Sequence, residues 1–388
     1  MIKTLTAYTT EIDDVDIAVK EILEQLNIED CLLKNSVGIL SCYSEFIDTG
    51  VVKSLCEKLP FDVVGVTTLA CAVSEQYNET MLSVMVITSD DVSFVSGITD
   101  DITAGDNTVF EKAYATAVGK CCENPRFMLS FVPMTLEVSA ETVIKTMDEI
   151  TCNLPNFGTL AVDHTSDYHT SQTIYNGEAY YGRYVFLLFC GNISPRFFVA
   201  SISNENILRE KGVVTASHGN LMQTVNNISV TEYLHSLGLQ KDDNGSIIGI
   251  NSFPFVVDYN DGTTPVVRVM FNFAPDGSAV CGGDIPVGTT LSVGRIDANE
   301  VLNTSKQILE DVLSGGSLNG LLMFSCVGRY FAQGFDQTAE MRIVQQVLAG
   351  KDVPYQLIYS GSELCPVYNK TETAVNRNHN DTLVICAF

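Results

Sequence analysis

The chain has 388 residues, of which 46 % are apolar and 18 % charged, a composition typical of a globular protein and unlike that of a disordered chain. Its net charge of −25 would repel nucleic acid and anionic membrane surfaces, because binding to either depends on neutralisation by Lys and Arg. The N-terminus does not resemble a signal peptide, and no later segment approaches the roughly 20 apolar residues of a membrane span. We therefore expect a cytoplasmic protein of two or three domains that binds neither nucleic acid nor membrane.

An apolar strand, a helix and two further strands follow one another three times along the chain. The helix predictions rest on apolar residues at helical spacing, as with Met341, Val344 and Leu348, followed by Gly350 where a helix is expected to end. The strand predictions rest on short runs of β-branched and aromatic residues between turn residues. In chain order, the predicted elements of the three copies lie at 37–45, 50–60, 62–73 and 80–88; at 126–134, 139–151, 156–163 and 183–191; and at 321–329, 338–350, 354–364 and 381–388.

Each copy reads β-α-β-β and by itself leaves one face of its sheet apolar and uncovered. We therefore predict a mixed α/β (α+β) fold in which the repeated β-α-β-β units form mixed sheets that pack face to face, with the helices on the outside. The copies are only weakly similar, and β-α-β patterns also arise by chance. Duplication and coincidence are therefore both open on the sequence alone.

Residues 195–300 interrupt the repeats and read mostly as strands. Ser229 and Glu232 fit a capping box at the start of a short helix. Asp297 and Glu300 start a longer helix in a similar way.

The polar, turn-rich stretch 240–246 (QKDDNGS) is the best linker candidate in this region. A linker there leaves the first two units in one part of the chain and the third unit in the other. We therefore predict an N-terminal domain at 1–240 and a C-terminal domain at 247–388, the latter with a strand-rich entry before its unit.

Cysteines and histidines give little sign of a metal or cofactor. The twelve cysteines lie mostly within apolar runs such as GILSCY and VFLLFC, which indicates buried thiols in a long chain without an export signal. No Cys-x-x-Cys pair occurs and no His lies at zinc spacing from a Cys, so we predict no metal site. His164 and His169 in the polar turn DHTSDYHTS could ligate a metal or haem, but such loop histidines are more often solvated.

The stretch FSCVGR at 324–329 places Cys326 at the end of an apolar strand. A nucleophilic Cys needs a neighbouring base, and His379 is the one His of the predicted C-terminal domain, so a Cys-dependent hydrolase or transferase is one alternative. A Cys at a strand end is more often a small buried hydrophobe. Because the chain also lacks a Walker loop, a dinucleotide fingerprint and a nucleophile elbow, we predict that it is not an enzyme.

Arg329 and Glu363 stand at the ends of two predicted strands, where a charge is costly unless it has a partner. If those strands are parallel neighbours, both side chains lie at the sheet edge where α/β sheets bind ligands. A guanidinium can clamp a carboxylate and a carboxylate can accept from an ammonium group, so the two would complement the ends of an amino acid. The alternative is that Arg329 and Glu363 pair with each other.

The C-terminal third resembles the FIST C-terminal domain, through FSCVGR, DVPYQLIYSGSEL and HNDTLVICAF. The N-terminal 240 residues resemble the FIST N-terminal domain more loosely, through PFDVVGVTTLACAV, FLLFCGN and GVVTASHGN. In the first unit, Gly65, Thr67 and Thr68 match that family, whereas Ala70 and Cys71 replace its Gly-Glu pair. The pattern of the C-terminal domain falls on Phe324, Ser325, Cys326, Gly328, Arg329, Glu340, Pro354, Glu363, His379, Asn380 and Thr382.

This resemblance implies a sensory module of signal transduction that binds a small ligand such as an amino acid, or haem in some relatives. Because the chain has no room for an attached kinase or receiver, we expect a stand-alone sensor that acts on a separate signalling protein or sequesters its ligand. Apart from haem, no cofactor is expected, and a scaffold without any ligand is a further alternative. The expected ligand-binding residues are Arg329, Glu363, Ser325, Cys326, Tyr359, Ser360, His379, Asn380, Thr67 and Thr68.

Overall fold

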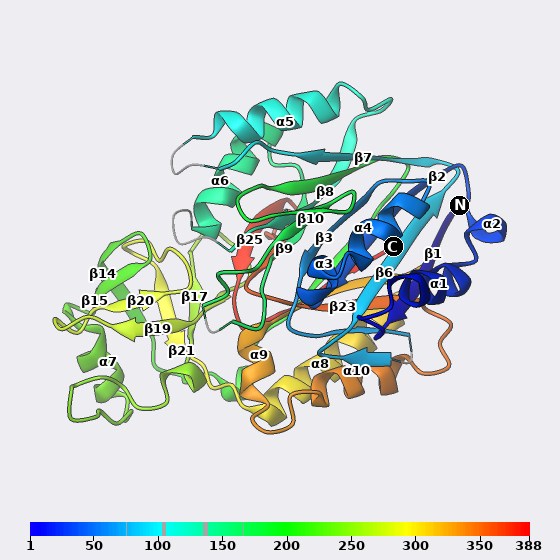
Figure 1. Ribbon diagram of the computed structural model, residues 1–388. Helices are drawn as coiled ribbons and strands as arrows, with labels where there is room; N and C mark the ends of the chain where they lie inside the picture. The colour runs from blue at the N-terminus through cyan, green and yellow to red at the C-terminus, as the bar shows by residue number, and fades with distance from the viewer. Residues whose placement is uncertain (75, 103–105, 135–138, 166) are drawn as a thin grey trace.

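Figure 1 shows a computed structural model of the chain, which describes residues 1–74, 76–102, 106–134, 139–165 and 167–388. Three α/β units follow one another, and a smaller β-rich region is inserted into the third unit and lies to one side of the three (Figure 1). Within the described ranges, no helix is both long and apolar enough to cross a membrane.

Each unit contains an edge strand, a helix, a pair of parallel strands joined through a second helix, a β-hairpin and a closing strand. The first unit consists of β1 (Ile2–Thr9), α1 (Val15–Leu26), α2 (Ile28–Cys31), β2 (Asn35–Cys42), α3 (Glu45–Asp48), α4 (Val51–Lys58), β3 (Val63–Thr67), β4 (Cys71–Val73), β5 (Gln76–Asn78) and β6 (Leu82–Ser89). The second unit consists of β7 (Val92–Ile98), α5 (Thr108–Val118), β8 (Pro125–Val132), α6 (Ala140–Thr151), β9 (Asn156–Leu160), β10 (Thr173–Tyr175), β11 (Glu178–Tyr180) and β12 (Val185–Gly191). The third unit consists of β13 (Arg196–Ala200), α8 (Ala298–Ser314), β22 (Leu321–Cys326), α9 (Val327–Ala332), α10 (Ala339–Leu348), β23 (Tyr355–Ser360), β24 (Glu363–Tyr368), β25 (Ala374–His379) and β26 (Leu383–Ala387).

The units exchange their hairpins in a cyclic manner. Four strands of each unit form one sheet in the same order, namely β1-β6-β2-β3 in sheet 1, β7-β12-β8-β9 in sheet 2 and β13-β26-β22-β23 in sheet 3. Beyond the fourth strand, each sheet continues with a hairpin from another unit: β10–β11 pairs with β3, β24–β25 with β9, and β4–β5 with β23. The identical order in three sheets confirms the mixed α/β fold built from repeated units, and it adds an edge strand and a hairpin to the predicted β-α-β-β pattern.

Two segments that were each predicted as one strand are divided in the structure into two strands that belong to different sheets. The run 62–73 divides into β3 in sheet 1 and β4 in sheet 3, and the run 354–364 divides into β23 in sheet 3 and β24 in sheet 2. The prediction of one continuous strand at each place is therefore wrong. Apolar patterning does not reveal the break, because these strands are buried on both sides of it and lack the alternation of a half-exposed strand.

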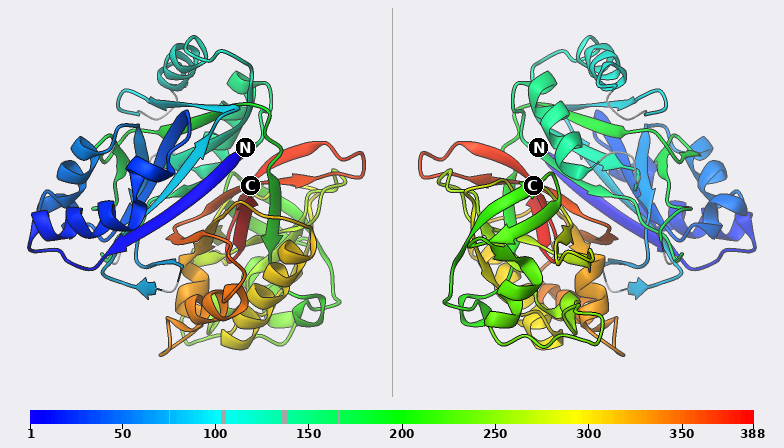
Figure 2. Two further views of the ribbon diagram at one scale, coloured as in Figure 1. Left: turned by 90° about the vertical axis from the view of Figure 1, so that its right-hand side faces the viewer. Right: turned by 90° about the vertical axis from the view of Figure 1, so that its left-hand side faces the viewer.

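A shared apolar core fills the space between the three sheets. It contains buried side chains from all of them, including Ile39 of sheet 1, Phe157 of sheet 2 and Phe324 of sheet 3, and the rings of Phe157 and Phe324 stack with centroids 5.0 Å apart. Separate apolar clusters lie between each sheet and its outer helices, α1 and α4 on sheet 1, α5 and α6 on sheet 2, and α8 and α10 on sheet 3 (Figure 2). The helices are thus outside and the sheets pack face to face, as predicted.

The inserted region forms a fourth sheet with its own apolar core. Its helix α7 begins after Ser229, whose hydroxyl accepts from the N–H of Glu232, and α8 beyond it begins after Asp297, whose carboxylate accepts from the N–H of Glu300, so both predicted helix starts are confirmed. The predicted linker 240–246 lies within this region, between α7 and β17, and the domain division at 240 stays a prediction. The elements of the region are η1 (Asn204–Asn206), β14 (Gly212–His218), β15 (Leu221–Val225), β16 (Ile228–Ser229), α7 (Val230–Ser236), η2 (Ile250–Ser252), β17 (Phe255–Asp258), β18 (Val266–Arg268), β19 (Met270–Phe273), β20 (Ala279–Cys281) and β21 (Thr290–Val293).

Candidate ligand site

A fully buried ion pair lies between sheet 3 and its helices. Nη2 and Nε of Arg329, on α9, donate to Oε1 of Glu340, on α10, at 2.8 and 3.0 Å, and neither side chain is exposed to solvent. The hydroxyls of Ser325 and Tyr359 donate to Oε2 at 2.7 and 2.8 Å, and that of Ser305 donates to Oε1 at 2.7 Å. We refer to these five residues as the Glu340 cluster.

Glu340 is the ion-pair partner of Arg329. Burial by itself would raise the pKa of Glu340, but the charge of Arg329 and the hydroxyl hydrogen bonds outweigh it and hold that pKa below its usual range. Because Glu340 neutralises the guanidinium, the alternative in which Arg329 pairs with Glu363 is wrong. The role predicted for Arg329 as a clamp for a ligand carboxylate has no support in this geometry.

A second buried cluster lies where the chain crosses from sheet 3 to sheet 2. Cys326 ends β22, Glu363 begins β24, and Asp381 and Thr382 precede β26; the exposed fractions of Cys326, Glu363 and Asp381 are 4 %, 0 % and 2 %. Oγ1 of Thr382 donates to Oε2 of Glu363 at 2.8 Å. A Cβ at Gly328 would lie 1.9 Å from Oδ1 of Asp381 and 3.7 Å from Sγ of Cys326, so only glycine admits the carboxyl group this close to the start of α9. We refer to these five residues as the crossover cluster.

The crossover cluster contains buried polar atoms without partners. Within the part of the chain that the structure describes, Oε1 of Glu363 and Oδ2 of Asp381 make no hydrogen bond. In the segment just before Asp381, Nδ1 of His379 and Oδ1 of Asn380 are also buried without a hydrogen-bond partner among the described residues. Buried polar atoms are nearly always hydrogen bonded, so the two carboxyl oxygens of Glu363 and Asp381 mark the crossover cluster as a candidate for binding water, an ion or a ligand.

Burial controls ionisation in the crossover cluster. It raises the pKa of Glu363 well above its usual range, although the hydrogen bond from Thr382 opposes that shift. It also raises the pKa of Asp381 to about 7. The pKa of Cys326 is raised first by burial and then by the charges of Glu363 and Asp381. The Cys326 thiol is therefore uncharged at neutral pH, burial disfavours the charged form of the Glu363 carboxyl, and a nearby cation would favour ionisation of both carboxyl groups.

Cys326 and His379 do not form a catalytic pair. Nε2 of His379 lies 3.0 Å from the carbonyl oxygen of Cys365, and burial lowers the pKa of His379 to about 3. Among the described residues no hydrogen bond joins His379 to Cys326, and the raised pKa of Cys326 disfavours the thiolate that a nucleophile requires. Ser360, at the end of β23, donates to the carbonyl oxygen of Ser362 at 2.6 Å and so shapes the turn that leads to β24.

The remaining predicted residues connect segments around the two clusters. Nδ2 of Asn380 donates to Oγ of Ser362 at 3.1 Å. Oγ1 of Thr68 donates to the carbonyl oxygen of Tyr359 at 2.8 Å, and Oγ1 of Thr67 accepts a backbone N–H of the second unit at 2.9 Å. The two threonines therefore fasten the first unit to its neighbours at the point where its hairpin leaves for sheet 3.

Glu340 and Asp381 are the two acidic residues of the clusters that sequence reasoning did not select as site residues, and Ser305, Gly328 and Thr382 were not selected either. Glu340 is the acidic residue that the FIST pattern places on the helix after FSCVGR, which was a signal that the Arg329 charge had a second possible partner. Asp381 lies inside the motif HNDT, between two residues that the pattern does specify. Its proximity to Cys326 follows from the antiparallel pairing of β26 with β22 in sheet 3, and the sequence does not reveal which strands pair.

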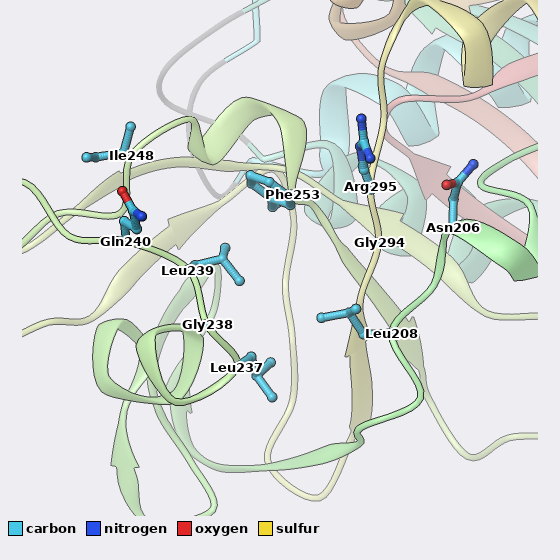
Figure 3. Close-up of a pocket in the computed structure, with 10 residues that line it drawn as sticks. All are labelled: Asn206, Leu208, Leu237, Gly238, Leu239, Gln240, Ile248, Phe253, Gly294 and Arg295. Carbon is cyan, nitrogen blue, oxygen red and sulfur yellow. The ribbon is translucent and has the colours of Figure 1, made fainter.

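A cavity of about 420 Å³ lies in the inserted region, and none of the predicted site residues lines it (Figure 3). Its walls are mainly apolar side chains, with Arg295 as the charged residue among them. The lining residues are Asn206, Leu208, Leu237, Gly238, Leu239, Gln240, Ile248, Phe253, Gly294 and Arg295.

Comparison with known proteins identifies the family. The pattern of the FIST N domain matches residues 36–228, and that of the FIST C domain matches residues 230–366. No curated protein matches the chain. Among solved structures, T. maritima PurL complexed with ATP aligns over 100 % of this chain and 71 % of that chain with 9 % sequence identity and a TM-score of 0.19, which is too low to support any argument. FIST domains are sensory domains of signal transduction. The two matches cover nearly the whole chain, and the protein therefore belongs to the FIST family, with a FIST N domain followed by a FIST C domain.

Proposed function

We propose that this protein is a stand-alone cytoplasmic sensor that binds a small ligand with a cationic group, an amino acid or a related amine, at the crossover cluster. One observation carries the proposal: Glu363 and Asp381 are buried close to Cys326 and have carboxyl oxygens without partners. An ammonium group supplies three donors and a positive charge, which complement those oxygens. Membership of a family of sensory domains supports a small ligand and a separate signalling protein as partner.

The position of the crossover cluster gives ligand binding a route to a change in domain packing. Glu363 pairs with Thr159 of the second unit in sheet 2, whereas Cys326 ends a strand of sheet 3. A ligand bonded to both Glu363 and Asp381 would hold the crossing segment in one arrangement between the two sheets. Because such a ligand binds that arrangement better than any other, it would shift the population of the protein towards it.

Ligand entry requires local opening, because the side chains of the cluster are buried. We therefore expect association to be slower than the 10⁵–10⁷ M⁻¹s⁻¹ or so that is typical of open sites. We also expect protons to be released on binding, since a cation favours the ionised form of carboxyl groups whose pKa burial has raised. The affinity for an amine should consequently increase as the pH rises towards 7.

The test is thermal unfolding in the presence of individual L-amino acids and diamines at millimolar concentration. A ligand at about 100 times its dissociation constant adds about 2.7 kcal/mol of stability, which corresponds to an increase in Tm of roughly 5–11 °C for domains of this size. In Glu363→Gln the shift should disappear, while the fold should persist because glutamine resembles the protonated carboxyl group. Glu310→Gln, at an exposed position on α8, is the matched control and should keep the shift. A panel without any response, or a shift that survives in Glu363→Gln, would remove the basis of the proposal.

Haem is the alternative ligand suggested by the family resemblance. The ring of His164 packs edge-on against Tyr43 with centroids 4.5 Å apart, and Nδ1 of His169 lies 2.6 Å from Oδ1 of Asp167, so each imidazole already has a partner. The discriminating measurement is absorbance of protein purified from haem-supplied cells. A Soret band of one haem per chain that is lost in a His164→Ala or His169→Ala variant would favour haem over an amine.

A further inference from the structure

Two cysteines of the second unit lie in direct contact. Sγ of Cys190 donates to Sγ of Cys121 at a separation of 3.3 Å. Cys190 is in β12, where the pairing with β8 shifts register after Phe189, and Cys121 follows the end of α5. Because a disulfide bond is about 2.05 Å long, the two sulfurs need to approach by only about 1.3 Å to form one.

The two thiols differ in access to solvent. Cys190 is completely buried, whereas Cys121 is partly exposed and can meet a small molecule from solution. Its neighbour Cys122 is exposed, and within the described part of the chain its sulfur makes no hydrogen bond to another sulfur. An accessible thiol beside a second thiol is the arrangement found in redox-sensitive cysteine pairs, whereas cysteines that act only as small hydrophobes do not require contact between their sulfurs.

We propose that Cys121 and Cys190 form a redox modification site, which is converted to an intramolecular disulfide by exchange with a low-molecular-weight disulfide such as oxidised glutathione. In the first step the Cys121 thiolate attacks one sulfur of the small disulfide, which forms a mixed disulfide and releases one thiolate. In the second step Cys190 passes its proton to that thiolate, and its sulfur attacks Sγ of Cys121 and expels the second small thiolate, which takes up the proton that Cys121 lost on ionisation. Two cysteine thiols are thus oxidised by two electrons, and one small disulfide is reduced to two thiols.

The environment of the pair determines the order of these steps. Burial, followed by the contact with Cys121, raises the pKa of Cys190 to about 12, so Cys190 is a poor attacking group at neutral pH. The mixed disulfide on Cys121 should therefore accumulate before the internal bond closes. Once closed, the bond would tie the loop after α5 to β12, a central strand of sheet 2, which is also the sheet that contains Glu363.

The test uses the wild-type chain, equilibrated with glutathione at several ratios of oxidised to reduced form. The reaction is quenched with acid, free thiols are alkylated, and the digested protein is examined by mass spectrometry. We expect a peptide in which Cys121 and Cys190 are joined, lighter by two hydrogen atoms than the sum of its parts. Cys190→Ser should stop at the mixed disulfide on Cys121, and Cys122→Ser should form the internal bond as the wild type does.

A control in urea separates folded geometry from simple proximity in the sequence. In the unfolded chain the preference for joining Cys121 to Cys190 should be lost, because their sulfurs are then no longer held together. The proposal is overturned if the folded wild type yields no such peptide, or if it joins Cys121 to Cys122 in preference to Cys190. Because this experiment measures the mass of a cross-linked peptide and not the affinity for a ligand, its result is independent of the function proposed for the crossover cluster.

Discussion

Replacing Glu340 with glutamine preserves the shape of the side chain and removes the charge that neutralises Arg329. The carboxylate accepts hydrogen bonds at 2.7–3.0 Å from Ser305, Ser325, Tyr359 and two nitrogens of Arg329. A glutamine side chain would turn an NH₂ group towards some of those donors and leave the buried guanidinium uncompensated. Removal of one partner from a buried ion pair costs about 3–5 kcal/mol, and we expect Glu340→Gln to lower the free energy of unfolding by that amount.

Equilibrium unfolding in urea, followed by far-ultraviolet circular dichroism, measures this loss. At roughly 2–4 °C per kcal/mol, the same loss should lower Tm by about 6–20 °C. The matched control is Glu310→Gln on α8, where Oε1 lies 3.9 Å from Nζ of Lys306 and both side chains are more than half exposed. Exposed ion pairs of this kind contribute about 0.3–0.5 kcal/mol, so the control should change little.

The double variant Arg329→Met with Glu340→Gln distinguishes loss of a charge partner from loss of packing. If the cost of Glu340→Gln comes from an uncompensated guanidinium, removal of that guanidinium should recover much of it, with a coupling energy of about 2–3 kcal/mol. A loss below about 1 kcal/mol in Glu340→Gln, or strict additivity in the double variant, would refute the argument that Glu340 neutralises Arg329.

Three further predictions follow from burial and close packing. Because the pKa of Asp381 is raised to about 7, the folded state keeps a proton that the unfolded state loses above pH 4. As the pH rises from 4 to 7, this residue should therefore lower the free energy of unfolding by up to about 1.4 kcal/mol per pH unit. Asp381→Asn should remove this pH dependence, measured by urea unfolding at pH 5 and 8. Gly65→Ala places a Cβ 1.9 Å from the carbonyl oxygen of Leu40 and should cost at least about 2 kcal/mol, whereas Gly182→Ala, with nothing within 4 Å, should be neutral in the same assay. The imidazole signals of His379 should not titrate between pH 5 and 8 in NMR spectra, since burial lowers its pKa to about 3; a midpoint near 6.5 would contradict its burial.

The fold class was accessible from the sequence because local patterns determine it. Helical spacing before Gly350, together with the caps at Ser229 and Asp297, correctly located helices, and the order of strands and helices indicated α/β units. The hairpin exchange was not accessible. β23 is wholly buried and β24 is buried at every residue except Tyr368, so nothing in their apolar pattern shows that the chain changes sheets at Gly361, and the pairing partner of each strand depends on tertiary contacts.

The candidate site was predicted in part for the same reason. Sequence reasoning identified Arg329 and Glu363 as charges that need partners, and the structure places both in full burial. It failed to assign the partners, because the expectation of one continuous strand put Glu363 beside Arg329 at one sheet edge. The crossing to sheet 2 places Glu363 in β24, and the pairing of β26 with β22 brings Asp381 beside Cys326; proximity in the sequence shows neither.

The contrast between Glu340 and Glu363 indicates which carboxyl group serves stability and which is available to a ligand. Both are completely buried, yet the pKa of Glu340 is lowered and that of Glu363 is raised. The difference lies in their partners, since Glu340 has a guanidinium and three hydroxyl donors, whereas Glu363 has the hydroxyl of Thr382 and a second oxygen without a bond. A buried carboxyl group that lacks a positive partner gains most from a ligand that brings one. Under the proposed function, a cation should therefore bind at Glu363, and the ion pair at Glu340 should be unchanged by its arrival.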